Sequence, residues 1–171
     1  MVKKLDNTTL EGNPNELMAF QNEVSKLSNV ANGTESIANE LMTRVQYVKQ
    51  AVNNIPGIPY ELMVKASALE KELDDILWRF NGQQPKASQE ENWPAPPSIN
   101  EYLSVAAYGT FRSTSGPTQT MREQMKLAEE ALKPVYDRVK TMMEVDVIKL
   151  ESELDKYEVP FIPGRLPEWG K

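Results

Sequence analysis

The sequence predicts an all-α fold, an elongated antiparallel three-helix bundle, and three observations support this prediction. Two stretches of roughly forty residues repeat apolar side chains at the spacing of amphipathic helices. Helix-favouring Leu, Met, Ala, Glu and Lys dominate the middle of the chain, whereas runs of strand-favouring Val, Ile and Thr are absent. The 171 residues are also enough for one domain with a core of its own, so we expect a single domain over 1–171.

A seven-residue repeat predicts a first long helix over 13–55, after a loose lead-in at 1–12. Asn13 is the expected cap, and Glu16 is placed to complete a capping box. Gly33 costs about 1 kcal/mol relative to Ala, but the repeat stays in phase across it, so we expect the helix to continue. The two seams of the repeat are Leu17, Val24, Ala31, Ala38, Val45 and Val52, and Phe20, Leu27, Thr34, Leu41, Val48 and Ile55.

A broken middle leg is predicted next, running back along the first helix. Its first part is a helix over 59–81, with seams Leu62, Leu69 and Ile76, and Ala66, Leu73 and Phe80. A proline-rich connector over 82–97 follows, and it should be extended. Ser98 and Glu101 form a capping box that opens a short helix over 98–108, and Tyr108–Gly109 should close it.

The second long helix is predicted over 117–156, with Thr120 and Glu123 as a candidate capping box. Pro134 removes one backbone hydrogen bond and should bend the helix. Two four-residue steps, at Val139, Met143 and Val147, predict a stutter of the heptad. The expected buried stripe is Met121, Met125, Ala128, Leu132, Val135, Val139, Met143, Val147, Leu150 and Leu154.

Beyond this helix, the proline-containing tail at 157–171 should be extended and lie along the bundle. A longer antiparallel coiled coil completed by a second chain is the alternative architecture.

The composition excludes several classes of function. The net charge is −6 and basic residues alternate with acidic ones, which argues against a nucleic-acid partner. The chain has no Cys and no His, so it lacks thiol chemistry and the commonest general base and metal ligand. No apolar run approaches the roughly 20 residues of a membrane span, and the N-terminus lacks the apolar core of a signal peptide. We expect no metal site and no cofactor.

Several motifs in the second half resemble a known bacterial family. They lie at 69–74, 79–82, 108–109, 113–114 and 117–118, and in the closing Pro-Gly-Arg-Leu-Pro-Glu-Trp of 163–169. From about residue 62 to the end, the chain is similar to the C-terminal region of proteins with sortilin-like or BNR-type β-propeller repeats. These proteins are often labelled glycosyl hydrolases or photosystem-stability-factor-like proteins.

The resemblance implies that the chain is the helical C-terminal appendage of a longer, exported protein, periplasmic or extracellular. Any hydrolase activity would then belong to the propeller, and no catalytic residue is carried over to this chain.

The carboxylates are numerous, but their spacing is typical of solvated helix faces. A glycosidase needs two carboxyl groups roughly 5–9.5 Å apart across a cleft, and a bundle surface offers no such cleft. We therefore expect no enzyme. The carboxylates considered are Glu70, Glu72, Asp74, Asp75, Glu144, Asp146, Glu151, Glu153, Asp155 and Glu158.

Three hypotheses for function remain open at this point. The first is a non-catalytic interaction or scaffold domain that packs on its own propeller domain or on a second copy of the chain. The second is a module that binds a small anion or sugar through the loops at 83–97 and 110–117. The least favoured is a part of a glycoside hydrolase active site. The candidate interaction or loop residues are Trp78, Trp93, Tyr108, Arg112, Ser113, Thr114 and Trp169.

Overall fold

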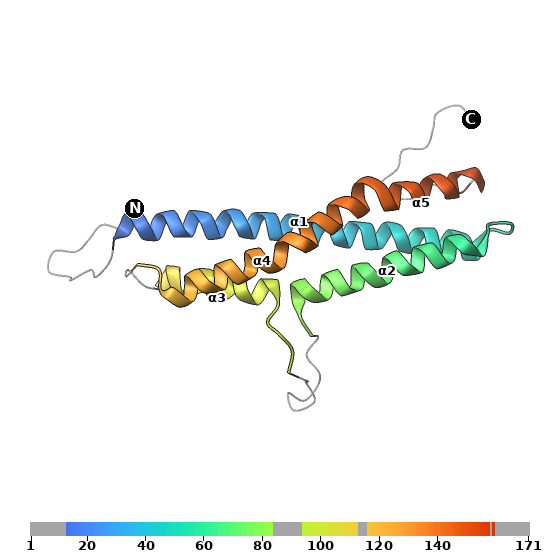
Figure 1. The fold of residues 1–171 in the computed structure, drawn as a ribbon. Coiled ribbons are helices and arrows are strands. Elements are labelled where there is room, and N and C mark those ends of the chain that lie inside the picture. Colours follow the sequence, from blue (N-terminus) through green and yellow to red (C-terminus); the bar gives the residue numbers. More distant parts are fainter. Residues whose placement is uncertain (1–12, 84–93, 113–115, 158, 160–171) are drawn as a thin grey trace. The chain divides into compact units, whose positions relative to one another are not determined.

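The computed structural model describes residues 13–83, 94–112, 116–157 and 159, and for residues 14, 111 and 112 it describes the backbone only. The predicted lead-in, most of the connector and nearly all of the tail lie outside the described residues. Within them every regular element is helical, which confirms the prediction of an all-α helical bundle. The elements, drawn in Figure 1, are α1 (Pro14–Asn54), α2 (Tyr60–Asn81), α3 (Ile99–Arg112), α4 (Gln119–Thr141), the π-helical turn η2 (Met142–Asp146), α5 (Val147–Leu154) and the 3₁₀ turn η3 (Asp155–Tyr157).

The chain forms two compact units, where the sequence analysis treated 1–171 as one domain. The first unit consists of Met1–Asn32 and Asn81–Lys133, and the second of Gly33–Phe80 and Pro134–Lys171, as far as each is described. The first unit contains the beginning of α1, α3 and most of α4. The second contains the remainder of α1, nearly all of α2, and the end of α4 with η2 and α5. Each unit is therefore built from three helical legs.

Helix α1 follows its heptad seams closely. Of the twelve predicted seam residues, Leu17, Leu27, Val52 and Ile55 are half-buried and the others are buried. The helix continues through Gly33, which is exposed and has no neighbouring atom within 4 Å of where a Cβ would stand. At its start the Asn13 side chain caps the amide of Asn15 at 3.0 Å, while the Glu16 carboxylate, predicted to complete a capping box, pairs with Arg122.

Helix α2 starts and ends one residue or less from the predicted bounds. Its predicted seam residues are buried, apart from the half-buried Leu69, and Met63 is buried as well. The turn before the helix and the residue after it both use glycine at positive φ, with Gly57 at 92° and Gly82 at 70°. Gly82 occupies the position where glycine commonly ends a helix, because other residues are strained in this left-handed conformation.

Helix α3 begins as predicted but ends later. The amide of Glu101 donates to the Ser98 hydroxyl at 3.2 Å, and the Glu101 carboxylate accepts from the Ser98 amide at 2.6 Å, so the capping box is confirmed. The predicted end at Tyr108 is wrong, because the helix continues to Arg112. Gly109 is helical, and a Cβ there would lie 1.9 Å from the terminal methyl of Met121. Its missing side chain thus makes room for α4 rather than ending α3.

The first unit has a small apolar core. Phe20 and Val24 of α1 pack with Ala106 of α3, and the half-buried Ala107, Met121 and Met125 pack against them. The predicted cap of α4 is displaced by two residues, since the Thr118 hydroxyl, and not Thr120, accepts from the amide of Met121 at 3.3 Å. Helix α4 begins at Gln119 accordingly.

The buried stripe of α4 and α5 differs from the prediction in one place. The helix continues through Pro134, and Ala128, Leu132, Val135, Val139, Val147, Leu150 and Leu154 are buried as expected. Met142 takes the core position predicted for Met143, which is half-buried. The stripe thus moves from Val139 by three residues and then by five, and η2 accommodates the longer step. The predicted stutter of two four-residue steps is therefore wrong, because the structure accommodates the extra residue in one π-helical turn.

Candidate functional site

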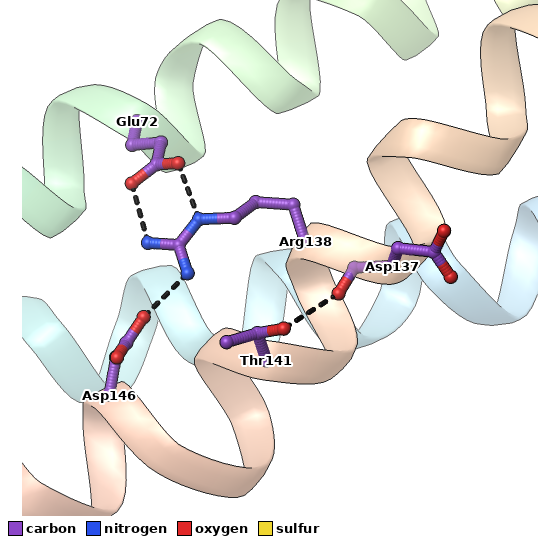
Figure 2. Close-up of polar contacts among 5 residues, drawn as sticks. All are labelled: Glu72, Asp137, Arg138, Thr141 and Asp146. Atoms are coloured by element: carbon purple, nitrogen blue, oxygen red, sulfur yellow. Dashed lines mark hydrogen bonds and ion pairs between the residues drawn. The ribbon is translucent and has the colours of Figure 1, made fainter.

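The second unit contains a three-membered ion cluster centred on Arg138 of α4. The guanidinium donates to both carboxylate oxygens of Glu72 on α2, at 2.5 and 2.8 Å, and to Asp146 of η2 at 2.6 Å (Figure 2). Two parallel bonds to one carboxylate fix the orientation of the guanidinium as well as its position. The cluster therefore ties α2 to the leg formed by α4, η2 and α5.

The π-helical turn explains how Asp146 reaches Arg138. The two residues are eight positions apart. At 3.6 residues per turn, eight residues exceed two α-helical turns by about 80°, which would point the side chains in different directions. A π-turn absorbs one extra residue, so Asp146 comes back close to the face of Arg138. Beside it, the Thr141 hydroxyl donates to the carbonyl of Asp137 at 3.0 Å, a bond that often accompanies a local distortion of a helix (Figure 2).

The cluster shifts the pKa values of its members. The hydrogen bonds from Arg138 lower the pKa of Glu72 below its ordinary value, although partial burial and the charge of Asp146 oppose the shift. The same pairing with Glu72, helped by Asp146, raises the pKa of Arg138. Glu72 and Arg138 are therefore both charged at neutral pH.

A second ion pair, between Arg44 of α1 and Glu151 of α5, is more deeply buried. The guanidinium Nε and one of its terminal nitrogens donate to the two carboxylate oxygens at 2.8 and 2.7 Å. The exposed fractions of the two side chains are only 14% and 5%. A pair withdrawn from water to this extent is costly to break, because the remaining charge would lose a bidentate partner in a site with little access to water.

Two further pairs join helices of the same unit. Lys49 of α1 pairs with Glu70 of α2, and Lys65 of α2 donates to Glu153 of α5 at 2.6 Å. The bond from Lys65 lowers the pKa of the Glu153 carboxyl. The contacts of Lys65 and Arg138 show that α2 runs antiparallel to the α4–α5 leg, because higher numbers on α2 meet lower numbers on that leg.

These contacts correct the prediction that the carboxylates lie on solvated helix faces. That prediction is wrong for Glu151, which is buried. The half-buried Glu70, Glu72, Asp146 and Glu153 are partly exposed, but each forms an ion pair that the prediction did not include. Asp74, Asp75, Glu144 and Asp155 are exposed as predicted, and Glu158 lies outside the described residues. One sequence signal could have identified Glu151: it falls within the apolar stripe, next to Leu150 and three residues before Leu154.

The described polar groups of the site consist mainly of charged side chains that are hydrogen-bonded to one another. Over the described ranges, no three acidic residues gather in a way that could hold a metal ion. Every buried side-chain nitrogen or oxygen in the same ranges has a hydrogen-bond partner. The arrangement therefore holds helices in register, and its polar groups are already satisfied by one another.

The first unit pairs its helices through Arg122. This side chain donates to Glu16 at 2.5 Å, and its guanidinium lies 5.6 Å from the ring centre of Phe20. The Gln21 amide of α1 donates to the carbonyl of Thr110 in α3 at 2.9 Å. Both contacts lie beside the small apolar core of this unit.

The structure does not gather the predicted interaction residues into one site. Trp78 is exposed on α2 in the second unit, and Tyr108 is exposed on α3 in the first. Arg112 is the last residue of α3. Trp93, Ser113, Thr114 and Trp169 lie outside the described residues, as does most of the loop predicted over 83–97. Of the loop predicted over 110–117, residues 110–112 belong to α3.

Comparison with known proteins identifies no relative of this chain. The chain matches no family model, no characterised protein and no solved structure. Its fold and its polar contacts define an all-α helical bundle held together by cross-helix ion pairs. The resemblance of its second half to propeller-associated proteins stays a prediction. None of the described helices is long and apolar enough to cross a membrane.

Proposed function

We propose that the chain is a non-catalytic interaction or scaffold module of an exported protein. It packs on a β-propeller of the same longer protein or on a second copy of itself. One observation carries the proposal: five of the candidate carboxylates, Glu70, Glu72, Asp146, Glu151 and Glu153, are occupied as partners of Arg or Lys. Charged groups used in this way hold neighbouring helices of one unit together and are not free for acid–base chemistry, which suits a module that acts by binding.

The pKa shifts favour this proposal over a role in glycoside hydrolysis. A glycosidase acid needs a raised pKa so that it still holds a proton near neutral pH. The pairing with Arg138 lowers the pKa of Glu72, and the pairing with Lys65 lowers that of Glu153. Both groups are therefore ionised and have no proton to donate to a leaving group.

Three exposed apolar side chains on one side of α2 support a contact with another protein surface. Tyr60, Val64 and Trp78 keep 72%, 56% and 45% of their surface exposed. Tyr60 and Val64 are four residues apart, and Trp78 follows Tyr60 by about five turns at 3.6 residues per turn, so all three lie on one side of the helix. Aromatic residues are enriched where proteins bind one another, because they bury a large area at little cost in conformational entropy.

The experiment is sedimentation velocity of the chain alone over a range of concentrations, and of its mixture with the propeller region of the full-length protein. We expect either self-association or a complex with the propeller. Trp78→Ser, on the exposed side of α2, should weaken whichever association is found, whereas Val105→Ser, at an exposed apolar residue of α3 in the other unit, serves as the surface control. A chain that stays monomeric and does not bind the propeller contradicts the proposal. Hydrolysis of glycan substrates by the chain alone would also contradict it.

A further inference from the structure

The helical leg between Val139 and Val147 carries one residue more than an α-helix needs. Both valines are buried in the core of the second unit and lie two helical turns apart. Two α-helical turns take about 7.2 residues, whereas eight steps separate these positions. In the structure the surplus is concentrated in η2, where the amide of Val147 donates to the carbonyl of Met142, five residues back.

The sequence allows a second way to accommodate the extra residue between Val139 and Val147. The structure divides the eight steps into three and five, with the fully buried Met142 between them. A division into four and four would place Met143 at the same core position and leave both valines where they are. Met143 follows directly in the chain and is already half-buried. Because the two side chains are identical and flexible, exchanging one for the other conserves the volume of the core.

We propose that this leg exchanges between two registers, in which Met142 or Met143 fills the same core position. In the structure, ion pairs hold the helix on both sides of the exchanging segment. Arg138 is bound to Glu72 and Asp146 at its borders, and the buried pair of Arg44 with Glu151 holds the helix beyond it. The change therefore rotates residues 142–145 and leaves the rest of the leg in place. A partner that touches the exposed side of this turn binds one register better and so shifts the population towards it.

A double-mutant cycle on the two methionines tests the proposal. Met142→Gln and Met143→Gln should each lower the thermal midpoint only slightly, because the other methionine then fills the core position. The double variant has no methionine left for that position, so its midpoint should fall by clearly more than the sum of the two single shifts. If Met142→Gln alone produces nearly the whole loss and Met143→Gln adds nothing, the structure has a single register and the proposal is wrong.

The matched control is the pair Lys149 and Leu150 in α5, an exposed residue followed by a buried one with no surplus residue nearby. Here Leu150→Gln should produce the whole loss, Lys149→Gln none, and the double variant their sum. A second measurement does not depend on variants that fold poorly. In the unmodified chain with ¹³C-labelled methionine methyl groups, the signals of Met142 and Met143 should show relaxation dispersion with one common rate constant.

Met143→Lys should abolish the dispersion at Met142, because a lysine in the core position is too costly for the second register to be populated. Absence of exchange at both methyl groups in the unmodified chain, or exchange at Met142 that survives Met143→Lys, overturns the proposal.

Discussion

The buried pair of Arg44 and Glu151 gives the sharpest prediction on stability. Glu151→Gln keeps the shape of the side chain but leaves a mostly buried guanidinium facing a neutral amide. Breaking such a pair by removing one partner costs about 3–5 kcal/mol. The Arg44 side chain is still 14% exposed and can shift towards water, so we expect the lower end of this range, about 3 kcal/mol. For a chain of this size that corresponds to a decrease of roughly 6–12 °C in the melting temperature.

Replacing both partners should have the opposite outcome. In Arg44→Met with Glu151→Leu, two charges that had lost most of their hydration are exchanged for apolar side chains of similar volume. Such exchanges are often neutral or stabilising by about 1–4 kcal/mol. The double variant should therefore melt at or above the temperature of the unmodified chain, although Glu151→Gln, which removes only one of the two charges, is strongly destabilised.

The assay is thermal and urea unfolding followed by far-ultraviolet circular dichroism, which reports on an all-α chain directly. Glu153→Gln is the matched control, because Glu153 lies on the same helix but pairs with Lys65 at the surface, where the two side chains remain 53% and 41% exposed. Its melting temperature should equal that of the unmodified chain within error. If Glu151→Gln behaves like this control, the buried pair does not hold the helices as its geometry implies.

The remaining predictions concern two glycines and the ion cluster. Gly33→Ala should stabilise the chain by about 0.5–1 kcal/mol, because Gly33 is helical and exposed, with no atom within 4 Å of an added Cβ. Gly82→Ala should destabilise the chain by about 1–2 kcal/mol, because Gly82 has φ 70°. Urea unfolding of both variants measures this contrast, and equal effects would contradict it. The pKa of Glu72 is lowered in the folded state, so its contribution to stability is present above the unfolded pKa of about 4.3 and is lost as the pH falls through the lower folded value. Glu72→Gln should therefore be less stable than the unmodified chain by about 1 kcal/mol or less at pH 7, since the pair is partly exposed. This difference should shrink progressively as the pH falls below about 4.3, and a difference that does not shrink in acid would refute an ionic origin.

The sequence predicted well what depends on local pattern. The seams of α1, the capping box of Ser98 with Glu101 and the glycine after α2 are decided by residues within one or two turns of each other, so a single chain displays them. The continuity of α1 at Gly33 was predictable for the same reason, because the seams keep their phase on both sides. The end of α3 was not, since the role of Gly109 is to admit Met121, and that contact joins two helices.

The ion pairs could not be predicted from the sequence, for a related reason. Glu72 and Arg138 are 66 residues apart, and Arg44 and Glu151 are 107 apart. A carboxylate on a helix looks the same in the sequence whether its neighbour in space is water or an arginine, and the register between helices decides which it is. That register follows from the packing of all three legs of a unit, so the predictions placed these residues in water.

The stutter shows how a correct pattern can give an incorrect contact. The count of eight residues between Val139 and Val147 requires a surplus residue, and the sequence revealed that requirement. Where the surplus is placed is not decided by the count, because either Met142 or Met143 would divide the eight steps between the two valines. The structure concentrates the surplus in a π-turn and so brings Asp146 beneath Arg138, a contact that a regular α-helix over the same residues would not make. The ion cluster and the wide turn are thus one feature: the surplus residue keeps the apolar stripe in phase and also completes the polar link to α2.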